Sequence, residues 1–584
     1  MFNKLIFVSF STLVLCNNVL CQENPIVETQ HGQISGKVWK TLFKNINYFG
    51  FLGIPFAEPP LGELKFMDPK PVEPWQGVLS ATKLKPACIQ FNHNIKKGQP
   101  YGLYGSEDCL YLDIFTPGVD KEKRAVVVFT YNHYFYNSYN KTKDYAPDFF
   151  IEEDIVVVTI SHRLSAFGFL SLESETLPGN AGLKDIVLSL EWIRDNIENF
   201  GGDPNRITMM GAESGAAAID LLIHSKAKSL FSAAILQSGT SWTPAQLQKD
   251  VRERAFKLGK MMNITTSSEI ILLKELRNVD NLQIASRDVH ACPDDYFKET
   301  QNSVIAFGPI VEKQPRGLIT EYPESSDSEI NIPILMGYNS REGLEPSLEY
   351  LKEPRFLPFV NKDFPLLFPI RVNFAFDPRK QVFSDARVEI KNFYFPKGKI
   401  NVKNVPEIVT LTGDTIVNYA LDYTARLYSK RSSKPVFYYH FDYYSELNEN
   451  KNAVMNLSVV EDGTWGTATG DEMCYLFKCP NLKNVYLKLK QQDSEELIVQ
   501  KKMLRLWANF IKYGNPTPDN DEILEGLKWP TYTIENKEYL DIGKELKIKT
   551  DLNKERYEFW DNFIEKWGQR AVNGIISESI KDEL

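Results

Sequence analysis

Five short apolar runs restrict the fold of this 584-residue chain more than any other feature of its sequence. Segments with helical periodicity lie between them, such as LKDIVLSLEWIRDNIENF over 183–200. Uninterrupted apolar strands that alternate with helices are typical of parallel sheets covered on both faces. We therefore predict an α/β fold with a large, mostly parallel, twisted sheet, helices on both faces and, over 240–460, a helical roof of insertions. The five runs are AVVVFTY from Ala125, IVVVTI from Ile155, RITMMG from Arg206, SAAILQS from Ser232 and IPILMGY from Ile332.

Charge and hydropathy exclude several classes of function. The formal net charge of −9 argues against a nucleic-acid partner, because such partners require a basic patch. After residue 21 no apolar run approaches the roughly 20 residues that a membrane-spanning helix needs, so we predict no membrane span. The cysteines lack the paired Cys-x-x-Cys or His-x-x-x-His spacing of a zinc site. We expect no metal and no other cofactor.

The two ends of the chain predict its compartment. Residues 1–21 combine one lysine, an apolar run and a cleavage site near Cys21 with small residues. This pattern is typical of a secretory signal peptide. The last four residues, Lys581, Asp582, Glu583 and Leu584, form a K-D-E-L address that a retention receptor recognises. We therefore predict a protein of the endoplasmic reticulum lumen, with one domain over 22–580 and a retention tail over 581–584.

Cysteine usage and glycosylation motifs agree with an oxidising lumen. The signal peptide removes two cysteines and leaves an odd number, so at least one of those left is unpaired within the chain. Cys88 with Cys109 would close a modest loop, whereas the pairing of Cys292, Cys474 and Cys479 stays open. Three N-x-[ST] sequons predict glycosylation at Asn140, Asn263 and Asn456.

One strand-to-helix junction has the form of a nucleophile elbow. In NRITMMGAESGAAAIDLLIHS, over 205–225, a strand-like run meets glycine and small residues before a helical pattern. In an elbow of the G-x-S-x-G kind the middle serine is exposed at a strained tip and attacks the substrate. Here the frame runs from Gly211 to Gly215, and Glu213 occupies the middle position.

Several long stretches follow one another in a characteristic order along the chain: FLGIPFAEPPLGELKF, SEDCLYLDIFTP, PDFFIEEDIVVVTISHRLSAFGFLSL, GNAGLKD, IRDNIENFGGDPNRIT, LQSGT, GYNSREG, GDEMCYLF and YGNPTP. With these stretches the chain resembles the type-B carboxylesterase and cholinesterase family of α/β-hydrolases almost from end to end. The resemblance implies the α/β-hydrolase fold, a Cys88–Cys109 disulfide and the positions of a catalytic triad.

Position by position, the resemblance implies a degenerate triad. Glu213 matches the nucleophilic serine, Glu342 matches the triad acid and Thr469 matches the triad histidine. A threonine hydroxyl is far too weak a base to take and return a proton near neutral pH. Ser214 would be the nucleophile only after a one-residue slip, which would give the elbow the wrong flanking residues.

The oxyanion loop departs from the family as well. Its His-Gly-Gly-Gly-Phe pattern matches Tyr131, Asn132, His133, Tyr134 and Phe135 in this chain. Glycines let backbone N–H groups approach an oxyanion without a side chain in the way. We therefore treat His133, Tyr134 and Ser214 as former oxyanion-hole positions, two of which now carry bulky rings.

Three hypotheses follow for the function. We favour a catalytically inactive, carboxylesterase-like scaffold that binds a small lipophilic ligand or a lumenal client protein, in which Glu213 hydrogen-bonds Thr469 or Tyr134. The second is an enzyme with altered chemistry, in which Glu213 acts as nucleophile or as acid/base with His133 or Glu342. The third is a residual carboxylic ester hydrolase that uses Ser214 or water.

Overall fold

The computed structural model describes most of the chain. The signal peptide, the sequon at Asn140 and the retention tail lie outside the described residues, so those predictions stay predictions. Asn263 and Asn456, the other two sequon asparagines, are both exposed. The described residues are 24–92, 102–138, 144–244, 246–292, 305–314, 316–363, 371, 374–519 and 521–578.

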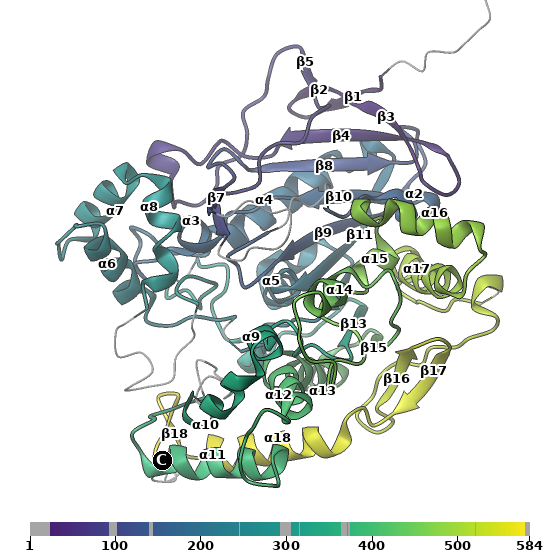
Figure 1. Ribbon diagram of the computed structural model, residues 1–584. Coiled ribbons are helices and arrows are strands. Elements are labelled where there is room, and N and C mark those ends of the chain that lie inside the picture. Colours follow the sequence, from purple (N-terminus) through teal and green to yellow (C-terminus); the bar gives the residue numbers. More distant parts are fainter. Residues whose placement is uncertain are drawn as a thin grey trace, which may run out of the picture.

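An 11-stranded sheet forms the centre of the molecule (Figure 1). Its strands run parallel from β10 to β16, whereas β8, β4 and β3 at one edge and β17 at the other are antiparallel. All five predicted strands are present, as β9 to β13, and the predicted fold class is confirmed. In spatial order the strands are β17 (Leu546–Thr550), β16 (Glu538–Ile542), β15 (Val436–Phe441), β13 (Ile334–Asn339), β12 (Ala233–Gln237), β11 (Gly202–Glu213), β9 (Arg124–Asn132), β10 (Val156–Ile160), β8 (Tyr111–Thr116), β4 (Asn47–Pro55) and β3 (Lys37–Lys40).

Each central strand is apolar on both sides because helices cover both faces of the sheet. Successive side chains of a strand point to opposite faces, so Val126 and Val128 of β9 join one core while Val127 and Phe129 join the other. The first core contains α4 (Ala181–Asn196) and α5 (Ser214–Ile223). The second contains α17 (Glu495–Tyr513), which is followed by Gly514 in a left-handed conformation.

The region 240–460 is largely helical, as predicted, but it also contributes to the sheet. Strands β13 and β15 lie within it, so it is more than a roof. One of its helices, α13 (Tyr419–Arg431), packs on these two strands and on α18 (Lys554–Gly568). The other main helices of the region are α6 (Val251–Met261), α7 (Glu269–Asn278), α11 (Gln381–Tyr394) and α12 (Val405–Gly413). No helix in the part of the chain described here has the length and hydropathy that crossing a bilayer requires.

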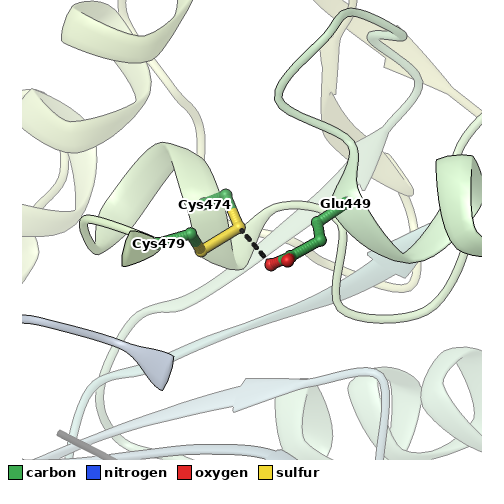
Figure 2. Close-up of side chains that lie close together, drawn as sticks. All are labelled: Glu449, Cys474 and Cys479. Atoms are coloured by element: carbon green, nitrogen blue, oxygen red, sulfur yellow. Dashed lines mark hydrogen bonds between the residues drawn. A yellow bond between two sulfur atoms is a disulfide. The ribbon is translucent and has the colours of Figure 1, made fainter. Parts of the chain in front are cut away.

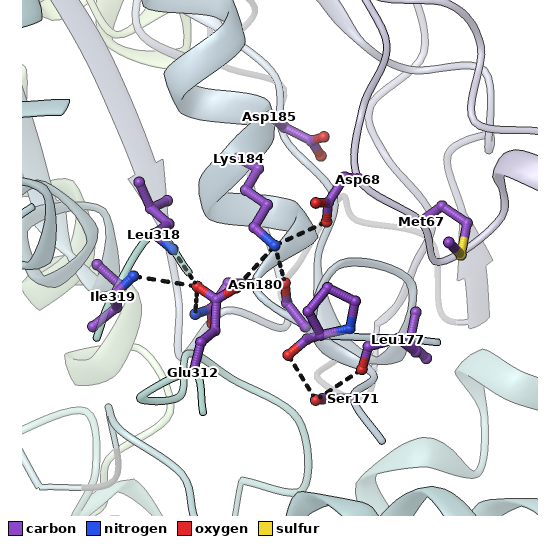
Figure 3. A network of polar contacts seen from close by, with 12 residues as sticks. Met67, Asp68, Ser171, Leu177, Asn180, Lys184, Asp185, Glu312, Leu318 and Ile319 are labelled. Atoms are coloured by element: carbon purple, nitrogen blue, oxygen red, sulfur yellow. Dashed lines mark hydrogen bonds and ion pairs between the residues drawn. The ribbon is translucent and has the colours of Figure 1, made fainter. Parts of the chain in front are cut away.

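A buried polar network fastens the segment around Glu312 to the start of α4 (Figure 3). Asn180, which precedes α4, exchanges two hydrogen bonds of 2.9 Å with the backbone of Ile310 and donates a third to Glu312. The Glu312 carboxylate also accepts from the backbone N–H of Leu318 and pairs with Lys184 at 2.9 Å. A buried charge is tolerated only when it is paired and hydrogen-bonded, so this network specifies where the segment lies.

Two disulfides join described residues. Cys88 is bonded to Cys109, as the resemblance implied, and Cys474 is bonded to Cys479, which decides the pairing that the sequence left open. Cys292 takes part in neither bond.

Candidate functional site

Glu213 lies at the tip of a sharp turn between a strand and a helix. Strand β11 ends at Glu213 and α5 begins at Ser214. Glu213 has φ of 52° and ψ of −121°, a backbone conformation that is costly for any residue with a side chain. A Cβ on Gly215 would lie 2.5 Å from the carbonyl oxygen of Thr130 in β9, so only glycine allows the helix to start this close to the sheet.

Both carboxylate oxygens of Glu213 accept hydrogen bonds from the end of the neighbouring strand. The Tyr131 hydroxyl donates to Oε1 over 2.7 Å, and Nδ1 of His133 lies 2.5 Å from Oε2. A carboxylate can only accept, so the imidazole nitrogen is the donor. The expected partners Thr469 and Tyr134 were wrong. The cause is the register between the two strands. Strand β9 runs parallel to β11 with Asn132 opposite Glu213. The neighbours of Asn132, Tyr131 and His133, therefore reach the Glu213 carboxylate.

The loop after β9 keeps a backbone shape that glycine adopts easily, although it carries rings. Tyr134 and Phe135 have φ of 49° and 58°, in the left-handed region. The rings of His133 and Tyr134 pack edge to face with centroids 4.5 Å apart. Both residues line the cavity at the elbow, so side chains occupy the space that a glycine loop would leave open.

Glu342 is a buried acid that is held by four donors. Its Oε1 accepts from the Ser238 hydroxyl and from the backbone N–H of Asn339, each over 2.6 Å, and from the Asn339 side chain over 3.3 Å. Its Oε2 accepts from the Thr469 hydroxyl. Burial raises the pKa of Glu342 to about 7, although these hydrogen bonds oppose the shift. Thr469 therefore orients this acid but supplies no base.

A second buried acid, Glu472, belongs to the same network and was missed in the sequence. The Asn339 side chain donates to it over 2.6 Å as well, and Gln237 donates over 3.1 Å. Burial is the main cause that raises the pKa of Glu472 to about 8, and the charge of the nearby Glu342 is the second cause. The sequence did contain a signal that Glu472 is buried. In the run GDEMCYLF this acid directly precedes a series of apolar residues.

Ser214, the alternative nucleophile, is buried at the first position of α5. It is 1 % exposed, and its hydroxyl has no hydrogen-bond partner among the described residues. It borders the same cavity as Glu213 and Thr469. No base therefore contacts this hydroxyl in the described part of the chain.

The space left at the elbow is small. The cavity lined by Glu213, His133 and Tyr134 holds about 30 Å³. Ligand sites for drug-sized molecules usually have about 300–1,000 Å³. The site as it stands has room for water-sized molecules only.

One group of side chains has the spacing of metal ligands, but two of its three members are bonded to each other. Cys474 and Cys479 form a disulfide, and Glu449 Oε2 lies 3.7 Å from the Cys474 sulfur (Figure 2). A cysteine binds metal as a thiolate, so the sulfurs of this disulfide are not metal ligands. Glu449 instead accepts a hydrogen bond of 2.9 Å from Asn481.

Comparison with known proteins gives a consistent result over nearly the whole chain. The model of the carboxylesterase family matches residues 23–560. Juvenile hormone esterase of Tribolium castaneum is 30% identical over 540 residues, which cover 89% of this chain and 88% of that protein. Acetylcholinesterase of Bungarus fasciatus is 30% identical over 572 residues, which cover 92% of this chain and 86% of that protein. Carboxylesterase 1F of Mus musculus is 28% identical over 594 residues, which cover 97% of this chain and 98% of that protein.

Proposed function

Because the chain belongs to the carboxylesterase family, whose members have the α/β-hydrolase fold, we propose that it is a member without ester hydrolase activity. In this proposal it resides in the endoplasmic reticulum lumen and binds a small lipophilic ligand or a lumenal client protein. Its relatives carry the names of esterases, so the proposed loss of activity distinguishes it from them.

The observation that carries the proposal is the state of Glu213. It lies at the tip of the strand-to-helix turn, and both of its oxygens already accept hydrogen bonds, from Tyr131 and His133. Two hydroxyls reach the acid Glu342, from Ser238 and Thr469, and neither can act as a base. In a serine hydrolase, removal of the nucleophile or the base costs on the order of a millionfold in kcat. Loss of one oxyanion donor costs on the order of a hundredfold or more.

The lumenal part of the proposal is supported by two features. The signal-like segment 1–21 and the K-D-E-L at 581–584 belong to the same secretory compartment. The two disulfides are compatible with an oxidising environment. We propose that a retention receptor binds the residues 581–584.

A second candidate function is supported by the contact between His133 and Glu213. In this version Glu213 attacks the substrate as a nucleophile, and His133 activates the water that releases the product. A pairing of Glu213 with Glu342 has less support, because Glu342 is held by Ser238, Asn339 and Thr469 instead. Residual ester hydrolysis through Ser214 has no base in contact with the hydroxyl among the described residues.

The test is hydrolysis of activated short- and medium-chain esters by the purified mature protein. Glu213→Gln and Ser214→Ala are assayed beside it, with an active esterase as a positive control and circular dichroism as a check of folding. We expect none of the three proteins to exceed the rate in buffer. Hydrolysis that disappears in Glu213→Gln would establish the second candidate, and hydrolysis that disappears only in Ser214→Ala would establish residual serine chemistry.

A further inference from the structure

A larger cavity lies outside the elbow, between α13, α18 and the segment after β12. It holds about 330 Å³, which is within the usual range of ligand sites. The rings of Trp242, Tyr419 and Trp560 and the side chain of Ile564 contribute to a mainly apolar lining. Thr415, also at its wall, belongs to a π-helical turn over Asp414–Asn418, a rare conformation that is frequent at functional sites.

Two buried hydrogen-bond donors line this cavity without a partner. Nε1 of Trp242 and Nε of Arg371 have none among the described residues. Trp242 is 8% exposed and the Arg371 side chain is also 8% exposed, so bulk water does not satisfy them. The guanidinium lies over the indole ring, 3.8 Å from its centroid, so the two side chains that carry these donors are in contact in the cavity wall. An unsatisfied buried donor costs free energy, and an acceptor atom in the cavity would remove that cost.

The charges around the cavity favour a neutral occupant. Arg371 is already paired with Glu324 over 2.7 Å. Asp414, which also lines the cavity, is fully buried and paired with Arg556 at 2.9 Å. A bound carboxylate would face Asp414 with no further cation in the described lining to balance it. Burial of an unbalanced charge is costly.

We propose that this cavity binds a neutral lipophile that carries a carbonyl oxygen, which accepts hydrogen bonds from Trp242 and Arg371. The apolar body of the ligand packs against Tyr419, Trp560 and Ile564 in the cavity wall. The inference rests on the ligand-binding part of the proposed function but not on the loss of hydrolysis, because the elbow takes no part in it.

The test is calorimetric titration of the full mature protein with 2-decanone, a ketone that no esterase can hydrolyse. Decanoate at pH 7.5 is the charged comparison. We expect 2-decanone to bind at one site and decanoate to bind at least tenfold more weakly. Trp242→Phe, which removes one donor and keeps an aromatic ring, should weaken 2-decanone binding by about threefold to tenfold, the value of one hydrogen bond.

A cavity-filling variant locates the site. Gly568, at the end of α18, borders the cavity, and a Cβ there would meet only one atom within 4 Å, at 3.9 Å. Gly568→Leu should therefore fold normally and weaken 2-decanone binding at least tenfold. Gly543→Leu, at a glycine outside the lining with similarly open surroundings, is the matched control and should bind as the wild type does.

Three results would overturn the inference. They are no 2-decanone binding by the folded wild type, equal or tighter binding of decanoate, and unchanged binding in both Gly568→Leu and Trp242→Phe. In the last case the protein would bind a lipophile elsewhere, so the proposed function would stand while this site would be rejected. If Gly568→Leu fails to fold, Trp242→Phe alone decides between the outcomes.

Discussion

At the residue scale, the polar side chains at the elbow hold one another by hydrogen bonds. A nucleophile at a strained turn must be free to approach the substrate, whereas Glu213 is held by Tyr131 and His133. Thr469 donates a hydrogen bond to Glu342 and so orients this buried acid. The result is a set of buried acids whose protonation affects stability more directly than chemistry.

The raised pKa of Glu342 predicts a specific dependence of stability on pH. Its pKa rises from about 4.5 in the unfolded chain to about 7 in the folded protein, so the folded state binds the proton more tightly. This contribution is present in full below pH 4.5 and is lost as the pH rises through 7. It amounts to on the order of 3 kcal/mol at 1.36 kcal/mol per pKa unit. We expect the Tm of the wild type to fall between pH 5 and pH 8 by more than that of Glu342→Gln.

The control for this comparison is Glu349→Gln, because Glu349 is exposed on α9 (Leu348–Lys352). Its Tm should follow the wild-type profile. Parallel profiles for the wild type and Glu342→Gln would show that Glu342 does not titrate in this range.

At the scale of elements, the loop after β9 decides what the elbow can accommodate. Its left-handed residues Tyr134 and Phe135 each cost on the order of 1–3 kcal/mol compared with relaxed backbone. The surrounding packing maintains this conformation: Phe135 is fully buried against Phe169. Introduction of a serine and a histidine at the elbow would therefore leave the space above them filled.

This predicts an order in which activity can be rebuilt. The double variant Glu213→Ser with Thr469→His should remain close to background in ester hydrolysis. Addition of His133→Gly and Tyr134→Gly should raise the rate by at least about a hundredfold, the value of one oxyanion donor. Initial rates of hydrolysis of an activated acetate ester are measured for the double variant and for the quadruple variant. The variant that carries only His133→Gly and Tyr134→Gly is the control. High activity of the double variant would mean that the rings do not obstruct the site.

The central elements could be predicted from the sequence, whereas the contacts between them could not. Runs such as AVVVFTY are apolar throughout because both faces of β9 are covered, and that pattern is local. The edge strands β3 and β17 carry exposed polar residues and give no such signal. The partners of Glu213 depend on the register between β9 and β11, which are 69 residues apart in the chain. The cavity beside Trp242 joins segments more than 300 residues apart, which no local pattern encodes.

At the scale of the whole molecule, the proposed retention signal should act independently of folding. The proposed retention tail at 581–584 follows the last described strand, β19 (Ile575–Ile576), and the contacts that define the described fold all join residues within 24–578. Its removal should therefore change where the protein goes without changing its stability.

We expect a chain truncated after residue 580 to accumulate in the culture medium of secretory cells, with the Tm of the full-length protein. Immunoblots of cells and medium measure the distribution. A chain that ends in Lys-Asp-Glu-Ala is the matched control and should also be secreted. Equal intracellular retention of all three would exclude the tail as the address.

The order of strands in the sheet also sets the timing of folding during synthesis. Strands β4 and β8 pair antiparallel at one edge early in the chain, whereas β15 pairs with β16, which follows about 100 residues later. At a synthesis rate of 5–20 residues per second, the apolar β15 waits for roughly 5–20 s with one edge unpaired. An unpaired apolar edge is a template for aggregation. The nascent chain therefore exposes an aggregation-prone edge during this interval, before its last parallel strand exists.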